Sequence, residues 1–84
     1  MNQSITPKVI RAGKILKAAV GPLEIPFGYK FASPPVVLLT SYWQGGAGEV
    51  GHIETVTAVD NDFCVITSGN AAANYFVDWM AVGE

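Results

Sequence analysis

A segment close to the end of the chain, residues 74–82, is apolar on both sides of an extended strand. Successive side chains of a β-strand point to opposite faces. One face then holds Tyr75, Val77, Trp79 and Ala81, and the other holds Phe76, Met80 and Val82, with Asp78 as its exception. A strand that is apolar on both faces is normally covered on both. We therefore expect one face in a sandwich core, with Trp79 in the core or an interface, and the other face against a neighbouring subunit.

Turn-forming residues divide the rest of the chain into similar short segments. We predict strands over residues 8–16, 23–31, 36–42, 52–59, 63–67 and 74–82. The alternation over 23–31 is the clearest strand signal, and Pro26 within it requires a sheet edge or a bulge. A helix over 9–20 is the competing prediction for the first segment, but Gly13, Gly21 and Pro22 make it short. In the strand interpretation, Gly13 marks a bulge or a close approach.

Six short strands with regular turns predict a single all-β domain over residues 1–84, an antiparallel six-stranded β-sandwich. Half of the residues are hydrophobic and only 14% are charged, compared with about 25% in a typical soluble domain. A domain this small has too few polar groups to cover its surface. We therefore expect a homo-oligomer in which neighbouring copies cover the apolar patches.

The distribution of basic residues argues against a nucleic-acid partner. Four of the five basic residues, Lys8, Arg11, Lys14 and Lys17, lie in the first segment. They alternate between the faces of a strand, so we predict solvated edge charges and no nucleic-acid partner.

Cys64, the only cysteine, is predicted to be a small buried hydrophobe. No signal peptide or membrane span is recognisable, which predicts synthesis in a cytoplasm without membrane insertion, and leaves open release or a place in a virion.

The reactive side chains are too few for a recognisable catalytic site. The single histidine and single cysteine have no acid beside them in a triad pattern. A zinc site would depend on His52, Cys64 and Glu49, and a glycosidase pair would need Glu54 and Asp78 on adjacent strands. We expect neither. The prediction is a protein that is not an enzyme and that uses no metal or cofactor.

Several pieces of the sequence together resemble one known family. They are residues 9–15 (VIRAGKI), 25–27 (IPF), Phe31, 34–39 (PPVVLL), Phe63 after a polar turn, and 77–81 (VDWMA). Their order and spacing resemble the H-type lectin domain of snail agglutinins and of the C-terminal half of slime-mould discoidins. The resemblance covers nearly the whole chain. It implies a six-stranded antiparallel sandwich that forms a trimer or a dimer of trimers and binds galactose or N-acetylgalactosamine, without calcium, at subunit junctions.

The sugar site typical of that family is not carried over. In this alignment the arginine of the fourth strand falls near Thr55, and the aromatic and histidine that follow the fifth strand fall on Thr67 and Ser68. The long loop that supplies acidic and hydroxyl groups is reduced to residues 18–22, which hold no polar side chain. The resemblance therefore implies the fold and leaves the ligand chemistry to other residues.

In such a run of strands, three connections emerge at one end and bring polar and aromatic side chains together. Ligand pockets mix apolar walls with a few placed polar groups. Our candidates for carbohydrate binding are Trp43, His52, Thr55, Ser68, Asn70 and Asn74. Each also suits a plain structural role: Trp43 a core or subunit contact, His52 the start of a strand, Asn70 and Asn74 the backbone of turns. Glu49, in the same region, is expected to be solvated.

Two functions of different classes follow from these observations. The first is an oligomeric lectin, in which weak sites repeated by symmetry bind glycan arrays with avidity; an agglutinin for defence shares this mechanism. The second is a structural adaptor, a trimerising unit of a phage tail or another bacterial assembly, with no sugar site.

Overall fold

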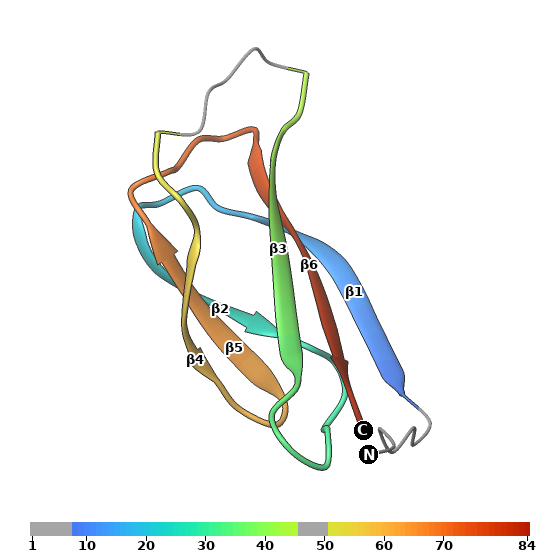
Figure 1. Cartoon of the computed structure of the whole chain (residues 1–84). Coiled ribbons are helices and arrows are strands. Elements are labelled where there is room, and N and C mark those ends of the chain that lie inside the picture. Colours follow the sequence, from blue (N-terminus) through green and yellow to red (C-terminus); the bar gives the residue numbers. More distant parts are fainter. Residues whose placement is uncertain (1–7, 46–50) are drawn as a thin grey trace, which may run out of the picture.

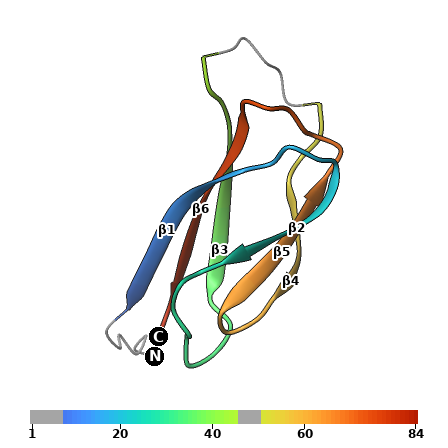
Figure 2. The ribbon, with the colours of Figure 1, turned by 180° about the vertical axis from the view of Figure 1, so that it is seen from behind.

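The computed structural model describes residues 8–45 and 51–84, which form β-strands and their connections. The strands are β1 (Val9–Leu16), β2 (Gly21–Pro26), β3 (Val36–Trp43), β4 (Thr55–Val59), β5 (Phe63–Ser68) and β6 (Tyr75–Gly83). They form two three-stranded sheets, ordered β1-β6-β3 and β2-β5-β4, and every pairing is antiparallel. Figures 1 and 2 show the sheets as two layers from opposite sides. The predicted all-β antiparallel sandwich is confirmed.

Most connections pass from one sheet to the other. Among the six strands, only β4 and β5 are consecutive in sequence and also paired. Because consecutive strands run in opposite directions, the described parts of the connections β1–β2, β3–β4 and β5–β6 lie at the same end of the sandwich (Figure 1, top). The predicted grouping of these three connections is therefore confirmed.

The core lies between the sheets and contains side chains from both layers and from the β2–β3 connection. Its buried members are Ile25, Phe27, Phe31, Cys64, Ile66, Tyr75, Val77 and Ala81. Phe27 and Phe31 pack edge to face with ring centroids 5.6 Å apart. Cys64 is buried and free, and Trp79 packs against the core, both as predicted.

Gly13 allows β1 to lie close beneath the indole of Trp79. The two residues are paired in the β1–β6 ladder, whose register is unbroken from Val9 to Leu16. A Cβ atom at position 13 would lie 2.9 Å from the indole Nε1. The sequence predicts that Gly13 marks a bulge or a close approach. The close approach is therefore confirmed, and the bulge is not found.

The second strand is shorter than its alternating sequence predicts. β2 ends at Pro26, whereas the pattern predicts a strand over 23–31. Gly28 has a φ angle of 70°, which interrupts an extended backbone. The backbone N–H groups of Phe27 and Phe31 donate to carbonyl oxygens of the β4–β5 turn at 3.0 and 2.8 Å. The even spacing of Phe27 and Phe31 is therefore not a continuation of β2. These two side chains anchor the β2–β3 connection in the core. β2 is an edge strand, as the proline requires.

The fourth strand is also shorter than predicted. It begins at Thr55, whereas the pattern predicts a start at residue 52. The backbone N–H of His52 donates to the side-chain oxygen of Asn70 at 3.1 Å instead of to a ladder. The β4–β5 register also shifts between Val56 and Ala58, as in a bulge.

The outer face of the β1–β6–β3 sheet is mostly apolar. Four rows of opposing residues cross it: Ile10–Val82–Val36, Ala12–Met80–Leu38, Lys14–Asp78–Thr40 and Leu16–Phe76–Tyr42. In the third row Lys14 Nζ lies 3.3 Å from Asp78 Oδ1 and 3.7 Å from the centre of the Tyr42 ring. Half of the twelve residues are large hydrophobic side chains that stay exposed in the single chain. The predicted second apolar face of residues 74–82 is therefore confirmed.

Candidate functional site

The end of the sandwich with the three connections, called the loop end below, consists of residues 17–20, 44–45, 51–54 and 69–74 among those described. It carries or adjoins all six predicted site residues. Glu49 lies outside the described residues. The loop end is therefore where the candidate site has to be examined.

A cluster of polar side chains beneath the loop end is centred on Glu54. Its Oε2 accepts hydrogen bonds from Ser68 Oγ at 2.5 Å, Tyr75 OH at 2.6 Å and Asn70 Nδ2 at 3.2 Å. Ser41 Oγ and Tyr75 OH share a further hydrogen bond of 2.9 Å. We call these five residues the Glu54 cluster. They join β3, β5, β6 and two connections around one carboxylate oxygen.

Asn70 connects the cluster to the segment before β4. Its Nδ2 also donates to the His52 carbonyl oxygen at 2.6 Å, and its Oδ1 accepts from the His52 N–H at 3.1 Å. Its own backbone N–H donates to Ser68 Oγ at 3.0 Å. Asn70 is buried. The side chain thus binds a neighbouring backbone, which is the turn role that its sequence position also suggested.

Lys17 reaches into the loop end from the residue after β1. It is only 1% exposed, and its Nζ donates to the carbonyl oxygens of Ala19, Ser68 and Asn70 at 3.0, 3.2 and 2.6 Å. The prediction of a solvated edge charge is wrong for this residue. Carbonyl groups of two turns surround the ammonium. Their hydrogen bonds take the place of those to the water molecules that the ammonium loses on burial.

The surroundings of Glu54 favour its ionised form. Burial is the largest single influence on the pKa of this carboxyl and raises it. The hydrogen bonds that the carboxylate accepts and the charge of Lys17 act in the opposite direction and outweigh burial, so the pKa lies below its ordinary value. Burial, and then the hydrogen bond to Glu54, raise the pKa of Tyr75. The tyrosine therefore remains a hydrogen-bond donor to a carboxylate.

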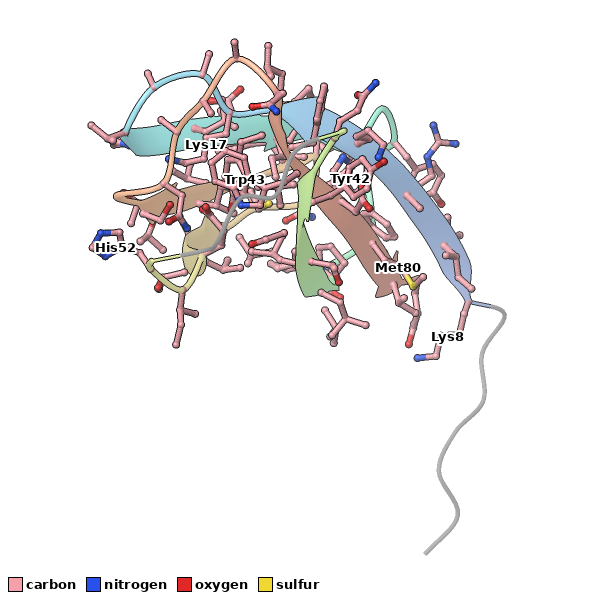
Figure 3. All side chains as sticks on the ribbon, turned by 90° about the horizontal axis from the view of Figure 1, so that it is seen from above. Lys8, Lys17, Tyr42, Trp43, His52 and Met80 are labelled. Atoms are coloured by element: carbon pink, nitrogen blue, oxygen red, sulfur yellow. The ribbon has the colours of Figure 1, made fainter. Side chains whose placement is uncertain are left out.

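Trp43 lies over the space between the sheets (Figure 3). Its ring centroid is 4.8 Å from that of Tyr75, and the side chain is half-buried. Its Nε1 is buried and has no hydrogen-bond partner within residues 8–45 and 51–84. This position fits the core-contact role of Trp43 better than that of an exposed stacking platform.

The other predicted residues do not form a single constellation. His52 is exposed and points away from the body of the protein (Figure 3). Asn74 is exposed and donates to the Gln44 carbonyl oxygen at 3.1 Å. Thr55 lies opposite Thr67 on the outer side of the other sheet. Of the predicted set, only Ser68, Asn70 and the backbone of His52 are brought into mutual contact.

A cleft of about 370 Å³ opens beside the Glu54 cluster. It is lined by Leu39, Ser41, Gly51, His52, Ile53 and Glu54. Small-molecule pockets span about 300–1,000 Å³, so this cleft has room for a small ligand. Within the described part of the chain, the second carboxylate oxygen of Glu54, Oε1, is buried without a hydrogen-bond partner. The cleft is thus lined by the apolar residues Leu39 and Ile53 and by the polar residues Ser41, His52 and Glu54.

Sequence reasoning missed Ser41 and Tyr75 and considered Glu54 only as a partner of Asp78. That pair does not form, because Asp78 lies on the outer face of β6 beside Lys14, in the other sheet. The sequence does contain a signal for Glu54. It lies two residues before Val56, which faces the core, so in an extended chain the two side chains point to the same face. A carboxylate on a core-facing position requires hydrogen-bonding partners.

Comparisons with protein-family models, with curated proteins and with solved structures found no match. No matched protein therefore indicates a ligand for this site, and only its own residues do. Over the described ranges, no group of three or more His, Cys, Asp or Glu side chains is placed to hold a metal ion. In the same ranges, no helix is long and apolar enough to cross a membrane.

Proposed function

We propose that this chain is the subunit of a homo-oligomeric lectin that binds galactose-type or N-acetylgalactosamine-type glycans in the cleft lined by Ser41 and Glu54. The observation that carries the proposal is that Glu54 lines the cleft and keeps one buried carboxylate oxygen, Oε1, without a hydrogen-bond partner among the described residues. A sugar hydroxyl is a donor that suits a carboxylate, and hydrogen bonds to charged groups are the stronger ones. His52 is a further polar residue that lines the cleft.

The apolar parts of the structure support the same proposal. Leu39 and Ile53 give the cleft an apolar side against which the less polar face of a sugar can rest. The outer face of the β1–β6–β3 sheet supports assembly into a trimer or a dimer of trimers, because large exposed apolar surfaces mark interaction sites. Repeated weak sites then bind a glycan array by avidity. The choice of galactose-type sugars rests on the resemblance to H-type lectins.

A structural adaptor is the second candidate, and one observation favours it. Most polar groups of the loop end already bond to one another, as Ser68 and Asn70 do through Glu54. Such a network stabilises turns without any ligand. In that case the apolar outer face alone carries the function, as the trimerising surface of a larger assembly.

The two candidates differ in the effect of Glu54→Gln on glycan binding. We expect the wild-type oligomer to bind on a glycan array, and calorimetry with the recognised sugar to show at least about tenfold weaker binding for Glu54→Gln. Glu24→Gln is the matched control, since Glu24 is exposed on β2 and does not line the cleft. A folded wild-type oligomer that binds no glycan, or equal affinities for the two variants, would refute the proposed site and leave the adaptor role.

A further inference from the structure

Each three-stranded sheet has two edge strands, which are β1 and β3 in one sheet and β2 and β4 in the other. An edge strand carries N–H and C=O groups that can pair with another chain. Proteins block unwanted pairing with charges, prolines, short strands and bulges. The four edges of this sandwich differ in how far they are blocked.

The edges of β1 and β2 are both protected. β1 carries Arg11 and Lys14, and Arg11 Nε donates to the Phe27 carbonyl oxygen at 3.2 Å, which ties that side of the sandwich together. β2 contains Pro22 and Pro26, which have no N–H to offer to another strand. Neither edge is suited to pairing with a further strand.

The edge of β4 is protected by its shape. The strand has only five residues, and its register shifts between Val56 and Ala58. Thr57, at the shift, donates its hydroxyl to the Val65 carbonyl oxygen at 3.2 Å. A bulge of this kind bends the strand and terminates regular pairing.

The edge of β3 has none of these protections. Its eight residues include no charge and no proline, and they pair with β6 in unbroken register from Val36 to Trp43. Every second residue of an edge strand directs its N–H and C=O away from the neighbouring strand. No backbone hydrogen bond joins those groups of β3 to any other described segment. Val36 and Leu38 are 65% and 57% exposed.

We propose that the free edge of β3 pairs antiparallel with β3 of a second copy of this chain, across a two-fold axis. A two-fold axis places the strand opposite itself, where a charged edge would repel its copy and this uncharged one does not.

The two-fold axis restricts the register of the pairing. Opposing residues must lie on the same face of the joined sheet, so the axis passes through a residue and not between two. Leu39 and Thr40 are the two central residues of β3, and an axis at either of them pairs the greatest length of the strand. With Leu39 at the centre, Val36 lies opposite Tyr42, a β-branched and aromatic pair of the kind that stabilises strands.

The joined structure is a continuous six-stranded sheet with its outer apolar faces side by side. Those faces remain free for other copies, so two-fold pairing and a trimer are compatible and together give a dimer of trimers. The pairing itself does not depend on glycan binding. The pairing is tested by whether the backbone N–H groups on the free edge of β3 form hydrogen bonds.

Amide hydrogen exchange of the unmodified chain, followed residue by residue by NMR, tests the pairing directly. A free edge exchanges every second amide of β3 at least about tenfold faster than its neighbours, because only the others bond to β6. A paired edge protects all of them, and dilution to monomers restores the alternation. Alternating exchange in a sample that sedimentation shows to be oligomeric would overturn the proposal, and so would a chain that stays monomeric at millimolar concentration.

Cysteine cross-linking gives an independent test. Opposing residues of antiparallel strands have Cα atoms about 4.5–5.5 Å apart, within the range that a disulfide spans. We expect Leu39→Cys or Thr40→Cys to form a disulfide dimer under mild oxidation at least about tenfold faster than Glu24→Cys on the edge of β2. Native Cys64 is buried and does not interfere. Equal rates for all three variants would contradict the pairing.

Discussion

The ammonium of Lys17 donates a 2.6 Å hydrogen bond to the carbonyl oxygen of Asn70 and so joins the end of β1 to the β5–β6 turn. The same ammonium bonds to carbonyl oxygens of Ala19 and Ser68. Asn70 in turn binds the backbone of His52 through its side chain. One buried lysine therefore stabilises two connections directly and a third through Asn70.

Replacement of Lys17 by methionine tests this role. The variant keeps the length of the side chain but leaves three carbonyl oxygens without their donor, and we expect the free energy of unfolding to fall by about 2–3 kcal/mol. Urea unfolding followed by tryptophan fluorescence measures the change. Lys30→Met is the control, because Lys30 is exposed, and such surface changes stay within about 0.5 kcal/mol. Equal midpoints for the two variants would show that the buried ammonium adds no stability.

The close approach of Gly13 to Trp79 predicts a penalty for any Cβ at position 13. The alanine Cβ would lie within about 3.0 Å of three indole atoms, and the rigid indole also packs against Phe27 at a centroid distance of 5.7 Å. We expect Gly13→Ala to lower the unfolding free energy by about 1–3 kcal/mol. Gly51→Ala is the control, because its Cβ would meet no atom within 4 Å.

A double-mutant cycle identifies the cause of that loss. Trp79→Leu removes the indole that the new methyl group would contact. If steric overlap causes the destabilisation, Gly13→Ala costs much less in the Trp79→Leu background than in the wild type. The same cost in both backgrounds would instead point to a backbone effect of the glycine.

Much of the fold is predictable from the sequence because strand alternation is a local property. The pairs Tyr75/Val77 and Phe76/Met80 are assigned correctly to opposite faces of β6 from spacing alone. The same rule fails at Phe27 and Phe31, which share strand parity but are anchored by hydrogen bonds to the β4–β5 turn. Those partners lie about thirty positions further along the chain, so no local pattern reveals them.

The candidate site is less predictable, for a related reason. The sequence places Ser68 and Asn70 at the correct end, but their side-chain partner is Glu54, across the β4–β5 hairpin. Whether a polar side chain faces solvent or a buried carboxylate depends on tertiary contacts. Lys17 shows the same limit, because the carbonyl groups that accept its hydrogen bonds belong mostly to a distant turn.

Acid should weaken the fold through Glu54. Its pKa in the folded state lies below the ordinary value of 4.5, so the folded protein binds this proton less readily than the unfolded chain does. The stabilisation is therefore complete above about pH 4.5 and is lost as the pH falls through the folded pKa. We expect the unfolding free energy of Glu54→Gln to decline less steeply than that of the wild type between about pH 6 and pH 3.

Serine 68 provides the internal comparison for this pH dependence. Ser68→Ala removes one donor to the carboxylate, so its pH profile should lie between those of the wild type and Glu54→Gln. Thr67→Ala, next in sequence but pointing to the other face of β5, should keep the wild-type profile. Identical slopes for all four proteins would show that Glu54 is not the titrating group.

The thiol of Cys64 should report global unfolding. Burial raises its pKa, and the side chain lies in the core, so neither the thiolate nor access for a reagent is present in the native state. We expect labelling by a thiol reagent at neutral pH to proceed at the rate of chain opening and to accelerate in Lys17→Met in proportion to its lost stability. Rapid labelling of the native protein would mean that β5 opens locally.

A positive charge on the outer face of the β1–β6–β3 sheet should dissociate the proposed oligomer. Met80→Lys places an ammonium in the middle strand, where a neighbouring copy would bury it without a partner. We expect the monomer to fold, because the side chain is exposed in the single chain, and the self-association constant from sedimentation to fall at least about tenfold. Val20→Lys is the control, since Val20 is similarly apolar and 64% exposed but lies in the β1–β2 connection. If Met80→Lys associates as the wild type does, this face is not the trimer interface, and the β3 edge remains as a separate contact to be judged by its amide exchange.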